Sequence, residues 1–285
     1  MPRLPSIPLL LWLVAAPIAA TPALDPALDA DTIYTRVLEN RFQSSVQEIE
    51  LVSGDRVGRE QSIRIQMLWR RYPKRDDRVL SRTLIRYQEP ADLRGTGYLV
   101  INKAEIPDDQ FIYLPSTRRT RRVSLRGETV IGTDLSIEDI VPRELEDADY
   151  QRAPDDEVDG VACYAIDATP IQAKDSHYGR LRIYVEPEHY VPLRTRYWDR
   201  AGVEVKELRA APGTIREIHD IWMPLAATMR HLLEGSYTSL RIVSLTPDPV
   251  HPKPYFTQRQ LDTRRQRFPP ELLESTLVFD AGAGE

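Results

Sequence analysis

The sequence contains a single cysteine, Cys163, so no disulfide can form within the chain. Noncovalent packing must therefore hold the fold together. Cys163 lies in the apolar segment 161–166, which has the composition of a buried strand. A thiol in such surroundings is inert, so we expect Cys163 to be a core residue and not a nucleophile.

Long hydrophobic runs are also missing. The longest run, Ile7–Ala16, has ten residues, whereas a membrane-spanning helix needs about 20. Arg3 precedes this run and small residues follow it, which is the pattern of a secretory signal peptide. We expect cleavage after Ala20, a periplasmic mature protein and only peripheral membrane contact. An uncleaved signal anchor is the alternative. The residue directly after Ala20 is Thr21 and not a cysteine, so we expect no lipid anchor.

An excess of basic residues is absent, because 43 acidic residues outnumber 38 basic ones and the net charge is −5. This balance argues against a nucleic-acid partner. The sequence has no nucleophile-elbow, phosphate-loop or zinc-protease motif, and its five histidines lack metal-ligand spacing. We therefore expect no enzyme activity, no catalytic residues, no metal and no cofactor.

Alternating polar and apolar residues are the main feature that is present. The clearest case is segment 62–71, where Ile63, Ile65, Met67 and Trp69 alternate with polar residues. Similar patterns predict about eleven antiparallel strands. Helices are expected near residues 32–42, 137–150 and 258–267. No alternation of strands and helices suggests a parallel sheet, so the sequence predicts a mainly β (α+β) fold.

Several motifs together resemble the outer-membrane lipoprotein-sorting group of the LolA-like superfamily. The resemblance spans roughly residues 30–268, and the motifs occur in a matching order. They are Phe111–Pro115 with Arg118, Arg119, Arg121 and Arg122; Gly132–Asp134; Glu138–Asp139; Asp159–Gly160; Tyr190–Arg194; Asp199 with Gly202; and Phe256–Thr257.

This resemblance implies an unclosed, strongly curved antiparallel β-barrel whose concave face is covered by helices. It implies one carrier domain, residues 21–270, followed by a flexible tail, residues 271–285. The expected function is periplasmic carriage of lipid or lipoprotein acyl chains between the inner and outer membranes, with an inner-membrane transporter of the RND type. A lipid-sensing regulatory module of the same fold is the alternative.

A carrier of this kind needs an apolar wall and a lid that moves. The alternation predicts that the wall is formed by Ile63, Ile65, Met67, Trp69, Ile85 and Tyr87. The glycine-containing loop at 127–134 and the segment after it predict a lid formed by Val130, Ile131, Leu135, Ile137 and Ile140. The same residues would also suit an ordinary closed core.

Arg118, Arg119, Arg121 and Arg122 form a basic cluster. Three interpretations remain open for them. They lie on a solvated strand face, they neutralise the acidic segment 128–149, or they dock lipid head groups or an acidic partner.

Overall fold

The computed structural model describes residues 24–72, 78–124, 129–174, 176–249, 253–261, 273 and 275–279. The predicted signal peptide lies outside these residues. The longer elements begin with α1 (Ala30–Glu39). The strands that follow up to the middle of the chain are β1 (Ser44–Gly54), β2 (Glu60–Arg71), β3 (Val79–Glu89), β4 (Gly97–Lys103), β5 (Asp109–Leu114) and β6 (Arg119–Val123).

The second half of the chain begins with the short helices α2 (Ile137–Ile140) and η1 (Leu145–Asp147). The strands are then β7 (Ala148–Val158), β8 (Val161–Pro170), β9 (Tyr178–Val185), β10 (Pro192–Asp199), β11 (Glu204–Ala210), β12 (Ile215–Ile218), β13 (Ile221–Pro224), β14 (Ala226–His231), β15 (Ser236–Pro247) and β16 (Leu277–Val278). The remaining short helices are η2 (Gln172–Lys174), η3 (Pro212–Thr214), η4 (Lys253–Phe256) and α3 (Gln258–Leu261).

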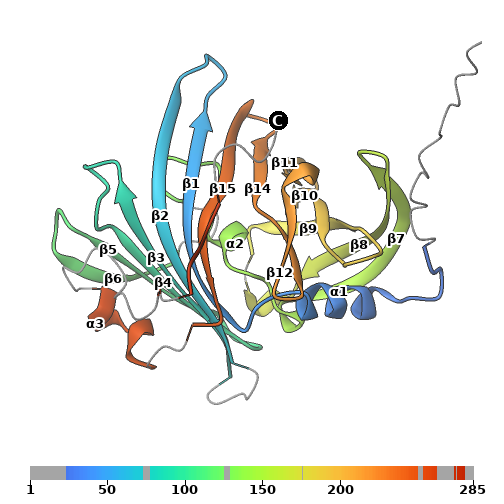
Figure 1. Ribbon diagram of the computed structural model, residues 1–285, viewed down its shortest axis with the longest axis horizontal. Helices are drawn as coiled ribbons and strands as arrows, with labels where there is room; N and C mark the ends of the chain where they lie inside the picture. The colour runs from blue at the N-terminus through green and yellow to red at the C-terminus, as the bar shows by residue number, and fades with distance from the viewer. Residues whose placement is uncertain are drawn as a thin grey trace, which may run out of the picture.

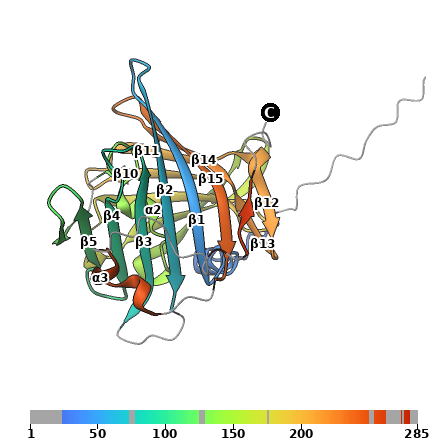
Figure 2. The same cartoon turned by 60° about the vertical axis from the view of Figure 1, so that its left-hand side comes forward.

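One antiparallel sheet of 14 strands dominates the described residues, in the order β6-β5-β4-β3-β2-β1-β15-β14-β11-β10-β9-β8-β7 with β16 beside β15. The sheet is unclosed because β6 and β7 are its two edges and do not pair with each other. Apolar residues from strands far apart in this order, such as Ile65 of β2 and Ile183 of β9, belong to one core. The sheet therefore bends around that core, as Figures 1 and 2 show.

Over β1–β5, apolar residues occupy successive positions of the strands. Because successive side chains point to opposite faces, both faces of the sheet are apolar there. The inner face carries the main core, which also takes in Ile33, Tyr34 and Leu38 of α1. Asp29 caps α1 by accepting a hydrogen bond from the Thr32 amide at 2.7 Å.

The prediction that the helices cover the concave face is wrong for the C-terminal helix. Leu261 of α3 and Phe256 of η4 pack on the outer face, against Leu68, Leu84 and Leu99. These three residues occupy the alternate positions of β2, β3 and β4 and need their own apolar cover. The outer cluster is therefore a second, smaller core.

The estimate of about eleven strands is too low, since sixteen occur among the described residues alone. The missed strand β7 is an edge strand, and its sequence is polar with Pro154 near a register shift between Ala153 and Asp156. Edge strands tolerate proline and expose one face, so the alternation is weak there. β16 lies in the segment that was predicted as a flexible tail, and it pairs with β15.

Among the described residues, no helix is both long enough and apolar enough to cross a membrane.

Candidate functional site

The six predicted wall residues lie on two adjacent strands. In the β2–β3 register, Ile65 pairs with Tyr87 and Met67 pairs with Ile85. All six side chains are buried, and all except Trp69 belong to the inner core. Contact of these residues with a ligand stays a prediction.

Residues 129–147, which we call the plug, lie against the inner face of the sheet, and α2 at their centre lies between the two arms of the curved sheet (Figure 1). The plug contains all five predicted lid residues. Val130, Leu135 and Ile137 are buried, while Ile131 and Ile140 are half-buried and pack against the same core. In this structure the plug is therefore closed over the predicted wall.

Local hydrogen bonds give the plug its shape. The Val130 amide donates to the Leu135 carbonyl at 2.7 Å. Ser136 and Asp139 form a reciprocal capping box at the start of α2. The Tyr87 hydroxyl, from the predicted wall, donates to the Ile131 carbonyl at 3.2 Å. The plug is thus a folded unit that is bonded directly to the wall.

Two aspartates of the plug, Asp134 and Asp139, fasten it to strands β15, β9 and β11. The Asp134 carboxylate accepts hydrogen bonds from Ser236 at 2.6 Å and Thr238 at 3.2 Å, both on β15. The Asp139 carboxylate accepts from the Tyr178 hydroxyl at 2.8 Å and from Lys206 Nζ at 3.1 Å. Because the Asp139 and Lys206 side chains are only 0% and 5% exposed, this is a buried ion pair.

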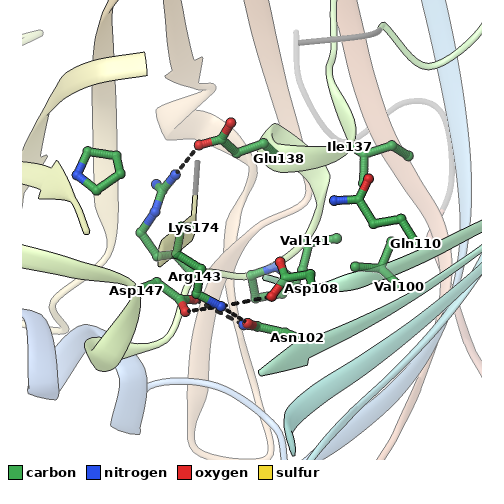
Figure 3. Close-up of a pocket in the computed structure, with 12 residues that line it drawn as sticks. Val100, Asn102, Asp108, Gln110, Ile137, Glu138, Val141, Arg143, Asp147 and Lys174 are labelled. Atoms are coloured by element: carbon green, nitrogen blue, oxygen red, sulfur yellow. Dashed lines mark hydrogen bonds and ion pairs between the residues drawn. The ribbon is translucent and has the colours of Figure 1, made fainter. Parts of the chain in front are cut away.

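The other anchors lie at and beyond the end of α2. Glu138 binds Arg143 at 3.3 Å (Figure 3) and His177 Nδ1 at 3.1 Å, and it also accepts from Ser176. Beyond α2, Glu144 forms ion pairs with Arg41 and Arg71. Asp147 forms an ion pair with Lys174 and accepts a hydrogen bond from Asn102.

Burial and charge act on these carboxylates in opposite directions. Burial raises the pKa of Glu144 despite Arg41 and Arg71, and its Oε1 has no hydrogen-bond partner among the described residues. Burial likewise raises the pKa of Asp108, although Lys174 lies 2.8 Å away. Burial also acts to raise the pKa of Glu138, but the hydrogen bond from His177 and the charge of Arg143 outweigh it and hold that pKa below the usual range.

A small cavity of about 60 Å³ remains beside the plug, between α2 and strands β4 and β5 (Figure 3). Its lining is partly charged and includes Asp108, Glu138, Arg143 and Lys174. Pockets for small molecules usually measure about 300–1,000 Å³. This cavity is therefore too small for an acyl chain while the plug is closed.

The four arginines of the basic cluster are all exposed, on β6 and the turn before it. Arg122 forms an ion pair with Asp109 of β5. The five anchoring carboxylates of the plug pair with other groups, so the interpretation that these arginines neutralise the acidic segment is wrong for those carboxylates. A docking role for the cluster stays a prediction.

Cys163 is fully buried, and burial raises the pKa of its thiol to about 12. No group of three or more His, Cys, Asp or Glu side chains that could hold a metal ion occurs in the part of the chain that the structure describes.

The Glu138 contacts lead us to predict how the stability of the fold depends on pH. Its folded-state pKa lies below its ordinary value of 4.5, so the carboxylate stabilises the fold above that pH and loses this effect as the pH falls through the lowered pKa. We expect Glu138→Gln to cost about 1.5–3 kcal/mol at pH 7, the range for hydrogen bonds to charged groups. The cost should shrink toward pH 3, as measured by urea unfolding at each pH.

The matched control is Glu157→Gln, because Glu157 is exposed on β7. It should change the free energy of unfolding little at any pH. An equal cost of Glu138→Gln at pH 3 and pH 7 would contradict the assignment of Glu138 as a charged anchor.

Comparison with known proteins gives two matching family models. One, described as a protein of unknown function (DUF1329), matches residues 30–126, and another, described as an uncharacterized protein, matches residues 80–263. No curated protein matches the chain.

Solved structures extend the comparison. A DUF1329 family protein from Desulfovibrio piger is 27% identical, with a TM-score of 0.74 over 80% of this chain and 95% of that chain. A putative outer membrane lipoprotein-sorting protein domain from Vibrio parahaemolyticus is 20% identical, with a TM-score of 0.74 over 82% and 98% of the two chains. A LolA superfamily protein from Nitrosomonas europaea is 20% identical, with a TM-score of 0.68 over 82% and 100%. The chain therefore matches the DUF1329 family model over residues 30–126 and has the fold of LolA-superfamily lipoprotein-sorting domains.

Proposed function

We propose that this protein is a periplasmic carrier that shelters the acyl chains of a lipid or lipoprotein between its plug and the inner face of its sheet. Cargo would move between the inner and outer membranes, and an RND-type exporter in the inner membrane would be the partner. The observation that carries the proposal is the plug, which covers a continuous apolar wall and is fastened by polar groups.

The energetics favour an exchange of the plug for a lipid. Burying hydrocarbon contributes about 0.8 kcal/mol per CH₂, so a sixteen-carbon chain gains on the order of 10 kcal/mol before ordering costs. An acyl chain would replace the apolar contacts of Val130, Leu135 and Ile137 with similar contacts. The cost of opening then lies mainly in the polar anchors, because an unmade buried hydrogen bond is expensive.

A reversible lock tests whether the plug must move. The Asp134 and Ser236 side chains meet at 2.6 Å, so cysteines at both positions place two thiols across the boundary between plug and sheet. The native Cys163 is fully buried and should not compete. We expect Asp134→Cys/Ser236→Cys to bind a fluorescent fatty-acid probe when reduced and to lose at least about ten-fold in affinity when oxidised.

The reduced form of the same variant is the control for the substitutions themselves. Mass spectrometry should confirm the disulfide, and native mass spectrometry of the wild type should identify any lipid bound in the periplasm. Equal probe binding by the oxidised and reduced forms would show that lipid, if bound, does not lie beneath the plug.

A further inference from the structure

Three neighbouring hairpins point the same way at one end of the sheet. They are β1–β2, β14–β15 and β10–β11, and their strands are consecutive in the sheet order. The first two tips touch, since Arg56 Nε donates to the Glu234 carbonyl at 3.2 Å. The third is joined to the second by a hydrogen bond from the Leu232 amide to the Val205 carbonyl at 2.9 Å. The β1–β2 hairpin extends furthest from the body of the sheet (Figures 1 and 2).

These tips carry most of the large apolar side chains that are exposed among the described residues. Four of the six large apolar side chains that are exposed lie there: Val57 at 74%, Leu233 at 60%, Leu232 at 46% and Val203 at 45%. Single exposed apolar residues are ordinary, but a group of them at one end of a molecule marks an interaction surface.

The tip segments Asp55–Arg59 and Asp199–Val203 are built in the same way. In each, the aspartate Oδ1 accepts from the amides two and four residues later, at 3.0 Å in the first segment and 2.9 Å in the second. Gly58 and Gly202 both take the left-handed conformation, with φ of 81° and 82°. Internal bonds thus fix both tips with their valine exposed, so the exposure is a property of the folded turns.

A lipid bilayer fits this surface better than a protein groove does. The four side chains sit on three separate projecting tips, and a bilayer interface accepts separate apolar points without a matching pocket. Arg56 and Arg59 flank Val57 in the sequence of the β1–β2 tip and are exposed, the Arg59 side chain at 83%, so they could bind head-group phosphates. The nearby Asp55 carboxylate is already used inside the turn and by Arg59.

The same end of the sheet borders the plug. An open groove is lined by the first turn of the plug, at Gly132–Asp134, and by residues of the β1–β2 and β14–β15 hairpins. A bilayer that touched the tips would therefore face the part of the plug that is held by Asp134 and Ser236.

We propose that Val57, Val203, Leu232 and Leu233 form a docking edge that inserts into the interface of a phospholipid bilayer and holds the plug next to that bilayer. The assignment of the docking edge stands on the tips alone. Transfer of an acyl chain at this edge rests on the proposed carrier function.

The test is flotation of the protein with vesicles of phosphatidylethanolamine and phosphatidylglycerol. We expect the wild type to float and Val57→Ser/Val203→Ser/Leu232→Ser/Leu233→Ser to lose about ten-fold or more of its bound fraction. The control is Leu277→Ser/Val278→Ser, which removes the other two exposed apolar side chains, on β16, and should float like the wild type. Both variants should melt like the wild type, because only exposed side chains change.

The docking edge is refuted if the wild type does not float, if the folded tip variant floats equally well, or if the control loses as much. Binding of a soluble fatty-acid probe separates this inference from the carrier function. A wild type that floats but binds no probe would keep the docking edge and reject the carrier. A wild type that binds the probe without floating would reject the docking edge and keep the carrier function.

Discussion

Asp139→Ala is expected to lower the free energy of unfolding by about 3–5 kcal/mol, which is the cost of breaking a buried ion pair by removing one partner. The substitution would leave the Lys206 ammonium buried beside Tyr178 without its carboxylate. It would also remove the capping-box bond from the Ser136 amide, which Asp139 accepts at 2.8 Å. Asp139 therefore joins the stability of α2 to its attachment to β9 and β11.

The same substitution should tighten lipid binding. If only the open protein accepts an acyl chain, the apparent dissociation constant is the intrinsic one divided by the fraction of open molecules. Each 1.4 kcal/mol by which the closed state is destabilised relative to the open one then raises the apparent affinity about ten-fold, until the open state predominates. Urea unfolding and titration with a fluorescent fatty acid measure the two effects.

Two further variants separate plug opening from general destabilisation. Asp149→Ala changes an exposed aspartate on β7 and should alter neither measurement. Asp139→Ala/Lys206→Met removes both charges and should recover part of the lost stability, because no unpaired buried charge remains. Reduced stability of Asp139→Ala with unchanged probe affinity would mean that the plug does not gate the binding surface.

The burial of the predicted wall residues could be inferred from sequence because it depends on local alternation. Period-two spacing fixes which side chains of β2 and β3 share a face, and all six predicted wall residues are buried. Alternation cannot say what covers that face. A ligand cavity and a closed core require the same apolar residues, and only the three-dimensional position of the plug shows that the face is covered in this structure.

The anchors could not be found in this way. Segment 137–150 was predicted as helical and acidic, with a second short helix starting at Pro142, and the structure has α2 at Ile137–Ile140 and the short 3-10 helix η1 at Leu145–Asp147. Its carboxylates pair with groups such as Arg41 and Lys206, 103 and 67 residues away, and such pairs leave no local pattern. Lys206 offered a weak signal, because it is a lone lysine within a strand. The structure shows that its side chain is buried.

Met67→Glu is expected to abolish binding of the fatty-acid probe, with a loss of at least about a hundred-fold. An acyl chain on the wall would have to remove water from the new carboxylate, and burying an unpaired charge costs several kcal/mol or more. In the closed protein Met67 is 7% exposed within the core beneath the plug. The same cost therefore acts on the ligand-free protein and favours states in which water reaches residue 67.

The matched control is Leu68→Glu, because Leu68 is the next residue of β2, is fully buried and lies on the outer face beneath Phe256 and Leu261. A domain is stable by only about 5–15 kcal/mol, so both variants should melt at a lower temperature.

Their responses should differ at the plug. Met67→Glu can relieve its charge by releasing residues 129–147, so its amides there should exchange hydrogen faster while the sheet keeps a cooperative melting transition. Leu68→Glu should leave plug exchange and probe binding unchanged in its folded fraction. Complete loss of the melting transition in Met67→Glu would place residue 67 in a permanently closed core, and unchanged probe binding would place the lipid away from this wall.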